Sequence, residues 1–145
     1  MTWLPCVLRC KLTSHINFTW RRKISANCEL INQICQELSA ILELNYKKHD
    51  LFACDLLLRE MLLNSINHGC NGKSEKLIRL KFSLSDHHFQ ITIKDPGNGF
   101  NHAKEIKSII NPENESGRGL QIIRKYSDKI RFNKSGNCIS IKRFF

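Results

Sequence analysis

Hydrophobic residues recur along this chain with two different spacings, and each spacing predicts a type of element. Three stretches repeat apolar residues at every third or fourth position, which predicts α-helices over residues 25–44, 50–68 and 119–126. Ser25 and Asp50 are the expected N-caps of the first two helices, and Gly69 is expected to end the second. A shorter amphipathic piece lies at about residues 103–110.

Alternation of apolar and polar residues predicts the strands. Residues 78–84 and 89–94 alternate in this way, and Ser85-Asp86-His87 between them suits a hairpin turn. Further strands are expected over residues 11–20, 129–134 and 138–144, the last two joined by a turn at 135–137. Hairpins combined with helices predict an α+β fold: a two-layer sandwich of a mixed, mostly antiparallel sheet with helices on one face.

Length and composition fit a single domain. The chain has 145 residues, of which 41% are hydrophobic and 25% charged, an ordinary globular profile. We therefore take residues 1–145 as one domain, in which residues 1–11 are assigned to no element. No apolar run reaches the ~18–20 residues of a membrane span, and the first residues lack the pattern of a signal peptide. We expect a cytoplasmic protein that does not bind membranes.

Basic residues exceed acidic ones, with 23 Lys and Arg against 13 Asp and Glu and a formal net charge of +10. This excess predicts an anionic partner such as nucleotide phosphates, nucleic acid or an acidic protein, or else a solvated basic surface. The seven cysteines show no zinc-ligand spacing. That favours buried thiols in a reducing compartment over a metal site at Cys6 and Cys10.

The second helix carries polar residues where a buried helix is expected. Its apolar side chains point in nearly every direction, which is typical of burial. Glu60, Asn64, Asn67 and His68 nevertheless fall within an arc of about 100°. Buried polar groups need partners, so this stripe either lines a polar pocket or faces water at the end of the helix.

Asp95 continues the apolar face of Phe89, Ile91 and Ile93, so its carboxylate lies where a core residue is expected. The loop Pro96-Gly97-Asn98-Gly99-Phe100 follows directly, and its glycines let the backbone approach a ligand closely. A buried acceptor there can receive the amino group of a purine. The alternative is an ordinary Asp-Pro-Gly turn.

A glycine-rich segment, Gly117-Arg118-Gly119-Leu120, opens the third helix. Helix N-termini present free N–H groups to anions, and Arg118 adds a charge suited to phosphate. The alternative is a plain junction between a loop and a helix.

Taken in order, these three segments resemble the N, G1 and G2 boxes of the GHKL ATPase superfamily, which includes gyrase B, histidine kinases and MutL. The resemblance covers about residues 12–145. Within that superfamily the chain is most similar to the anti-sigma-factor serine kinases. We expect the domain to stand alone; the first motif ends in His68-Gly69, and the segment between Gly99 and Gly117 is short.

The resemblance implies ATP or ADP and Mg²⁺ as cofactors and assigns roles to residues. Glu60 is the general base, Asn64 the protein ligand of Mg²⁺, and Asp95 the acceptor of the adenine amino group. Gly117 and Gly119 close over the phosphates. The other residues expected to contact the nucleotide are Asn67, His68, Gly97, Gly99, Phe100, Arg118 and Leu120, with Lys104 or Lys107 supplying charge to the terminal phosphate.

The resemblance also implies a function, a serine/threonine kinase that acts as an anti-sigma factor. Its substrate is a STAS-type anti-anti-sigma protein, its other partner a sigma factor, and its assembly a homodimer. We weighed two alternatives: a nucleotide-binding switch of the same fold without phosphotransfer, and nucleic-acid binding driven by charge. We expect no direct nucleic-acid contact, because aromatic residues make up only 8% of the chain and form no stacking platform. Arg124 and Lys125 mark a candidate docking helix for an acidic partner.

Overall fold

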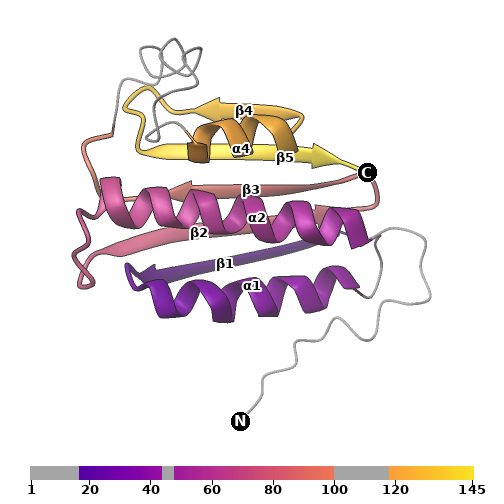
Figure 1. Cartoon of the computed structure of the whole chain (residues 1–145), viewed down its shortest axis with the longest axis horizontal. Helices are drawn as coiled ribbons and strands as arrows, with labels where there is room; N and C mark the ends of the chain where they lie inside the picture. The colour runs from indigo at the N-terminus through magenta and orange to yellow at the C-terminus, as the bar shows by residue number, and fades with distance from the viewer. Residues whose placement is uncertain (1–16, 44–47, 100–117) are drawn as a thin grey trace.

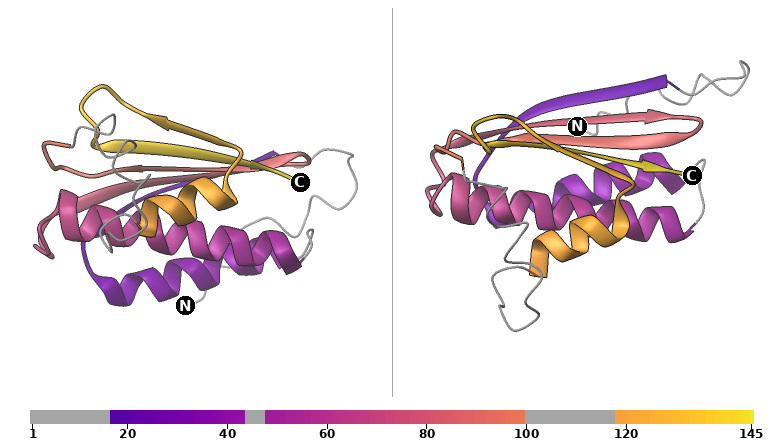
Figure 2. Two further views of the ribbon diagram at one scale, coloured as in Figure 1. Left: turned by 45° about the horizontal axis from the view of Figure 1, so that its top comes forward. Right: turned by 90° about the horizontal axis from the view of Figure 1, so that it is seen from above.

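The described residues form two layers, a five-stranded sheet and a layer of helices (Figure 1). The computed structural model describes residues 17–43, 48–99 and 118–145. The strands are β1 (Asn17–Ser25), β2 (Leu77–Ser85), β3 (His88–Lys94), β4 (Lys129–Phe132) and β5 (Cys138–Phe144). The helices are α1 (Cys28–Glu43), α2 (Lys48–Asn64) and α4 (Arg118–Tyr126), and the π-helical turn η2 (Ser65–Gly69) continues α2. All three helices lie on one side of the sheet (Figure 2), which confirms the expected α+β sandwich.

The strands follow the order β1-β2-β3-β5-β4, and every described pairing is antiparallel. The expected parallel component of a mixed sheet is therefore not found among the described strands. β5 is inserted between β3 and β4, although it comes last in the sequence. The end of β3 thus lies next to the start of β5, beside the loop that begins at Asp95.

The core lies between the two layers, because alternate strand residues point toward the helices. On β2 and β3 these residues are almost completely buried, and the rings of Phe82 and Phe89 stack with their centroids 6.2 Å apart. From the helix layer, Ile34, Leu38 and Leu42 of α1 pack against them. Burying one such side chain contributes about 1.5–3 kcal/mol, so these contacts stabilise the packing of α1 in the core.

Three of the cysteines in the helix layer are buried free thiols, as the sequence indicates. Cys35, Cys54 and Cys70 are buried and unpaired, and burial raises the pKa of the Cys35 thiol to about 12. Cys28 is exposed and Cys138 is partly buried. The alternative metal site at Cys6 and Cys10 lies outside the described residues.

The first strand, β1, runs to Ser25, five residues beyond its predicted end at Trp20, whereas residues 11–16 of the predicted strand lie outside the described residues. The sequence pattern assigns the run Arg21-Arg22-Lys23 to no element, but pairing with β2 holds it extended and places Ile24 opposite Ile78. Ser25 therefore belongs to the strand and does not cap α1. Asn27 does so instead, since its side-chain oxygen accepts a hydrogen bond from the Glu29 amide at 2.9 Å.

The second helix begins at Lys48, two residues before the expected N-cap. Asp50 therefore lies inside the first turn, where it is 6% exposed and 3.5 Å from Nε of Arg143 on β5. This ion pair joins the start of α2 to the sheet. The expected amphipathic piece at residues 103–110 lies outside the described residues.

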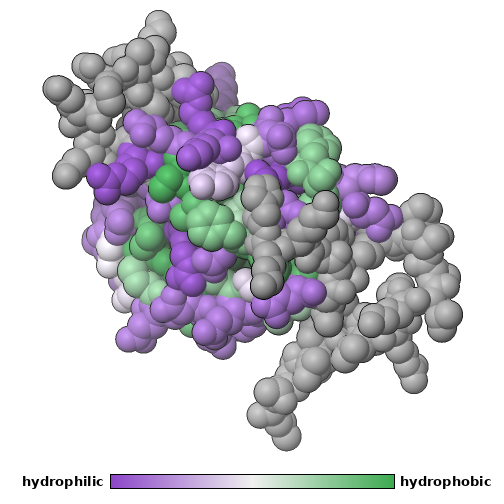
Figure 3. Space-filling view, turned by 45° about the vertical axis from the view of Figure 1, so that its right-hand side comes forward, coloured by the Kyte–Doolittle hydropathy of each residue, from purple (hydrophilic) through white to green (hydrophobic). Residues whose placement is uncertain are grey.

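On the face shown in Figure 3, green hydrophobic residues lie among purple hydrophilic ones. The large exposed hydrophobic side chains include Phe52, Phe144 and Phe145. Among the helices of the described residues, none is both long and apolar enough to cross a membrane.

Candidate functional site

The C-terminal end of α2 meets the N-terminal end of α4. The two helices pack in opposite directions, because the rings of Phe52 at the start of α2 and Tyr126 at the end of α4 lie 5.8 Å apart. At the other end Gly119 of α4 lies against Glu60 and Asn64 of α2. Side chains from the first predicted motif therefore reach the helix start in the third.

At Gly119 the backbone of α4 closely approaches side chains of α2. A Cβ atom at this position would lie 2.9 Å from Oε2 of Glu60 and within 3.4 Å of the amide group of Asn64. A side chain of any other residue would thus intrude on the space in front of these two polar heads. Because the first turn of α4 leaves backbone N–H groups free, carboxylate, amide and anion-binding donors converge on one spot.

The turn η2 changes the direction of the polar stripe beyond Asn64. Its wide geometry is set by the bond from the Cys70 amide to the Ser65 carbonyl, at 2.8 Å and five residues apart. Glu60 and Asn64 are partly buried, whereas Asn67 and His68 are exposed. The structure therefore brings the first two residues to α4 and leaves the last two facing solvent.

Asp95 stands at the end of β3 against the end of η2. A Cβ atom at Gly69 would lie 2.1 Å from Cγ of Asp95, so only glycine lets the helical backbone pass so close to this carboxyl group. The Gly97 amide donates a hydrogen bond to Oδ1 of Asp95 at 2.8 Å and fixes the carboxyl orientation. A carboxylate held in this way can accept the amino group of a purine.

The pKa of Asp95 is raised above its usual value, chiefly because burial disfavours the charged form. The hydrogen bonds from the backbone amides of Gly97 and Asp95 oppose this shift. An acceptor that is poorly solvated gains most from a donor supplied by a ligand, which suits recognition of an exocyclic amine.

The glycine loop after Asp95 is anchored on the turn between β4 and β5. Gly99 has φ +78°, and a Cβ atom there would lie 1.7 Å from the carbonyl oxygen of Ser135. Asn137 donates to the Gly97 carbonyl at 3.0 Å and accepts from the Asp95 amide at 3.1 Å through its own carbonyl. Sequence reasoning missed Asn137, whose only signal was its place in a predicted turn.

Four of the expected contact residues, Phe100, Lys104, Lys107 and Gly117, lie outside the described residues. Arg118 is exposed at the first position of α4, and Leu120 is partly buried two residues later. The described site therefore has two parts, Asp95 with Gly69 and Gly97, and Glu60 with Asn64 and Gly119.

The family model for the histidine kinase-like ATPase domain matches residues 24–143. The chain belongs to this family. The expected resemblance is thereby confirmed, and the ATPase fold implies that the domain binds a nucleotide.

Two curated relatives are both named anti-sigma F factor. The protein from Halalkalibacterium halodurans is 28% identical over 79 residues, which cover 52% of this chain and 54% of that protein. The protein from Bacillus subtilis is 28% identical over 101 residues, which cover 67% of this chain and 69% of that protein. The chain thus spans about half the length of the first relative.

The residues of this ATPase domain fit a magnesium ion shared with phosphates. No group of three or more His, Cys, Asp or Glu residues that could hold a metal occurs in the described ranges. Mg²⁺ is commonly held by only one or two protein oxygens, with phosphates and water completing its shell. The amide of Asn64 faces the space in front of Gly119, where such an oxygen is needed.

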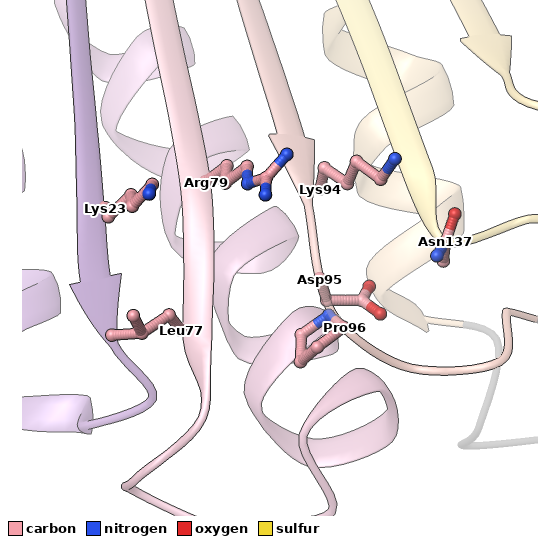
Figure 4. Close-up of a pocket in the computed structure, with 7 residues that line it drawn as sticks. All are labelled: Lys23, Leu77, Arg79, Lys94, Asp95, Pro96 and Asn137. Carbon is pink, nitrogen blue, oxygen red and sulfur yellow. The ribbon is translucent and has the colours of Figure 1, made fainter.

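A cavity of about 250 Å³ lies beside Asp95, on the face of the sheet away from the helices. Lys23, Arg79 and Lys94 line it, and Asp95 and Asn137 form one side (Figure 4). Glu60 and Asn64 belong to the helix layer, on the opposite face. This cavity is therefore separate from the space between α2 and α4.

Proposed function

We propose that this chain is a Mg²⁺-dependent serine/threonine protein kinase of the anti-sigma type. In this proposal it transfers the γ-phosphoryl group of ATP to a STAS-type anti-anti-sigma protein, and in its other state it sequesters a sigma factor. The observation that carries the proposal is the meeting of Glu60 and Asn64 with the start of α4 at Gly119. The names of the two relatives support the class of partner.

Each described part of the site has a task in binding ATP. Asp95 accepts the adenine amino group, and the free N–H groups at the start of α4 point toward the phosphates, with Arg118 adding positive charge. The oxygen of the Asn64 side chain holds Mg²⁺. When bound, the ion neutralises phosphate charge.

Glu60 is placed to handle the proton of the acceptor. The serine oxygen attacks the γ-phosphorus, so that a new O–P bond forms while the P–O bond to ADP breaks. The serine proton passes to the Glu60 carboxylate, which also orients the hydroxyl group. The need for Glu60 as a base distinguishes a kinase from a nucleotide-binding switch of the same fold, for which Glu60 is dispensable.

Nucleotide binding is tested by thermal unfolding of Asn64→Ala. ATP at about 100 times its dissociation constant stabilises the folded wild type by about 2.7 kcal/mol, and we expect most of the Mg²⁺-dependent part to be lost in the variant. Asn17→Ala, at the start of β1 and away from the site, is the control and keeps the full shift. An unchanged Mg²⁺-dependent shift in Asn64→Ala would remove Asn64 from the metal site.

Phosphotransfer is tested with Glu60→Gln, which keeps the shape of the side chain and removes its basicity. Mixed with γ-labelled ATP and a STAS partner, we expect the wild type to label a serine or threonine of the partner. The variant is expected to bind ATP but to transfer phosphate at least about a hundredfold more slowly. Glu75→Gln, in an exposed loop, is the control. Equal rates of phosphate transfer by Glu60→Gln and Glu75→Gln would contradict the role of Glu60 as base and favour the nucleotide-binding switch without phosphotransfer.

The homodimer and the cytoplasmic location expected from the resemblance belong to the same proposal. A dimer would present two nucleotide sites to one sigma factor. Light scattering across a concentration series, with and without ATP, measures this directly.

A further inference from the structure

The outer face of the sheet is strongly basic and is not covered by any described helix (Figure 2). Successive side chains of a strand point to opposite faces of the sheet. The residues that alternate with the buried ones therefore point outward, and the strand registers show which of them are neighbours. On the five strands, eight of these outward residues are Lys or Arg and none is Asp or Glu. We call this surface the outer face; its basic residues are Arg21, Lys23, Arg79, Lys81, Lys94, Lys129, Arg131 and Lys142.

The registers align the basic residues in rows across the strands. Lys23 of β1 lies opposite Arg79 of β2, and Arg79 lies opposite Lys94 of β3. Figure 4 shows these three side chains side by side on neighbouring strands. They also line the cavity that Asp95 borders, so this row surrounds a hollow lined by three basic side chains and one carboxyl group.

Further along the strands the same arrangement is repeated. Arg21 lies opposite Lys81, and Lys129 opposite Lys142, while Arg131 faces Ser140. Like charges directly opposite each other destabilise a sheet. Within the described part of the chain none of the eight basic groups forms an ion pair. A face that weakens its own fold in this way is typical of a binding surface, where a ligand supplies the missing charge.

Between the rows lie short side chains that donate hydrogen bonds. Oγ of Ser140 lies 2.9 Å from both Nε2 of Gln90 and Oγ1 of Thr92, and Thr19 donates to Ser83 at 3.3 Å. Arg, Lys, Ser, Thr and Gln are the side chains that contact phosphodiester groups in nucleic-acid complexes.

The composition of the outer face argues against a protein or a single strand as its occupant. Protein interfaces have an apolar centre depleted in Lys, whereas the centre of this face is polar and basic. Single strands need aromatic stacking platforms. On the described strands, Phe144 is the one outward Phe, Tyr or Trp; it lies at the end of β5 between Lys129 and Lys142, with each Nζ within 6.0 Å of its ring.

We propose that the outer face binds the phosphate backbone of duplex nucleic acid, with the row Lys23–Arg79–Lys94 at its centre. This departs from the expectation drawn from the sequence, which had only total charge and aromatic content to go on. The contacts are to phosphates, so recognition is independent of base sequence. The face lies opposite Glu60 and Asn64 but shares Asp95 with the proposed adenine site at the edge of its hollow, and the proposal does not depend on phosphotransfer.

The test compares two triple variants of the same net charge. In one, Lys23, Arg79 and Lys94 are each replaced by Ser; in the control, Arg22, Lys73 and Lys134 are replaced by Ser. Binding of a fluorescent DNA duplex of mixed sequence is followed by anisotropy over a salt series. We expect the first variant to bind about tenfold or more weakly, with a slope of log K against log salt that is lower by about 2.7. The control is expected to bind like the wild type.

Three outcomes would overturn the proposal. They are no binding of the duplex by the wild type at low salt, equal loss in both triple variants, and tighter binding of polyglutamate than of duplex at equal charge concentration. The last would assign the face to an acidic protein. An ATP-dependent thermal shift retained by the first variant shows that it is folded, and separates a failure here from a failure of the proposed kinase.

Discussion

At the scale of single residues, Asp95 shows how the site is built at the expense of the fold. The inward face of β3 is apolar at Phe89, Ile91 and Ile93 and then places a carboxyl group against the backbone of Gly69. Burial raises the pKa of that group, so its charged form is less favourable in the folded protein than in the unfolded chain. A ligand that donates a hydrogen bond to Asp95 compensates for this.

Asp95→Asn is therefore expected to stabilise the ligand-free protein at neutral pH. The raised pKa means that the folded wild type binds a proton more tightly than the unfolded chain, so its stability falls as pH rises from about 3.8 through the folded pKa. The gain in the variant should be largest above that pKa and vanish below about pH 3.8. Urea unfolding across pH measures it.

The matched control for this experiment is Glu75→Gln, whose side chain is exposed. It is expected to change the pH dependence of unfolding little. In the same samples Asp95→Asn should lose most of its thermal shift with ATP. An Asp95→Asn variant that is less stable than wild type at neutral pH would contradict this. It would mean that the hydrogen bond from the Gly97 amide stabilises the Asp95 carboxylate by more than burial destabilises it.

At the scale of the elements, like charges face each other across strands of the outer face. Arg79 is flanked by Lys23 on β1 and by Lys94 on β3, so two repulsive pairs meet at one residue. Arg131 lies on the same face but has the uncharged Ser140 opposite it. The two arginines therefore differ in their neighbours and not in their exposure to solvent.

Arg79→Glu is expected to raise the free energy of unfolding by about 1 kcal/mol at low salt, since each cross-strand charge pair contributes roughly 0.2–1 kcal/mol. The gain should shrink as salt screens the charges. Arg131→Glu makes the same change in net charge and should gain much less. Urea unfolding of both variants at two salt concentrations is the measurement, and equal gains would mean that total charge and not register is responsible.

At the scale of the whole molecule, the periodicities of the sequence predict the two layers and most elements. They succeed where burial imposes one pattern, as on β2 and β3. They fail for Arg21-Arg22-Lys23, which becomes strand only because β2 pairs with it. Asn27 and Asn137 were missed because short polar side chains occur in loops of every kind, and only tertiary contacts single these two out.

The candidate site was predictable in part for a similar reason. Helical spacing puts Glu60 and Asn64 on one side of α2. The order of the three motifs singles out Gly119 as part of the same site, and the structure has Gly119 against both residues. The turn η2 could not be predicted from helical spacing. Its hydrogen bond joins the Cys70 amide to the Ser65 carbonyl, five residues apart, so the residues beyond Asn64 no longer follow the α-helical direction. The rows of the outer face depend on registers between strands that are far apart in the sequence.

The outer face also limits how two copies of the molecule can pair. Two surfaces with eight basic groups each and no acidic ones repel when they are placed face to face. We therefore expect a homodimer to use another surface.

The insertion of β5 between β3 and β4 has a consequence for synthesis on the ribosome. Until Cys138–Phe144 has left the exit tunnel, β4 has no neighbouring strand and the edge of β3 stays open. The sheet therefore stays incomplete, with an unpaired edge on β3 that can pair with other chains, until β5 is available. We expect nascent chains stalled before β5 to need chaperones that full-length chains do not.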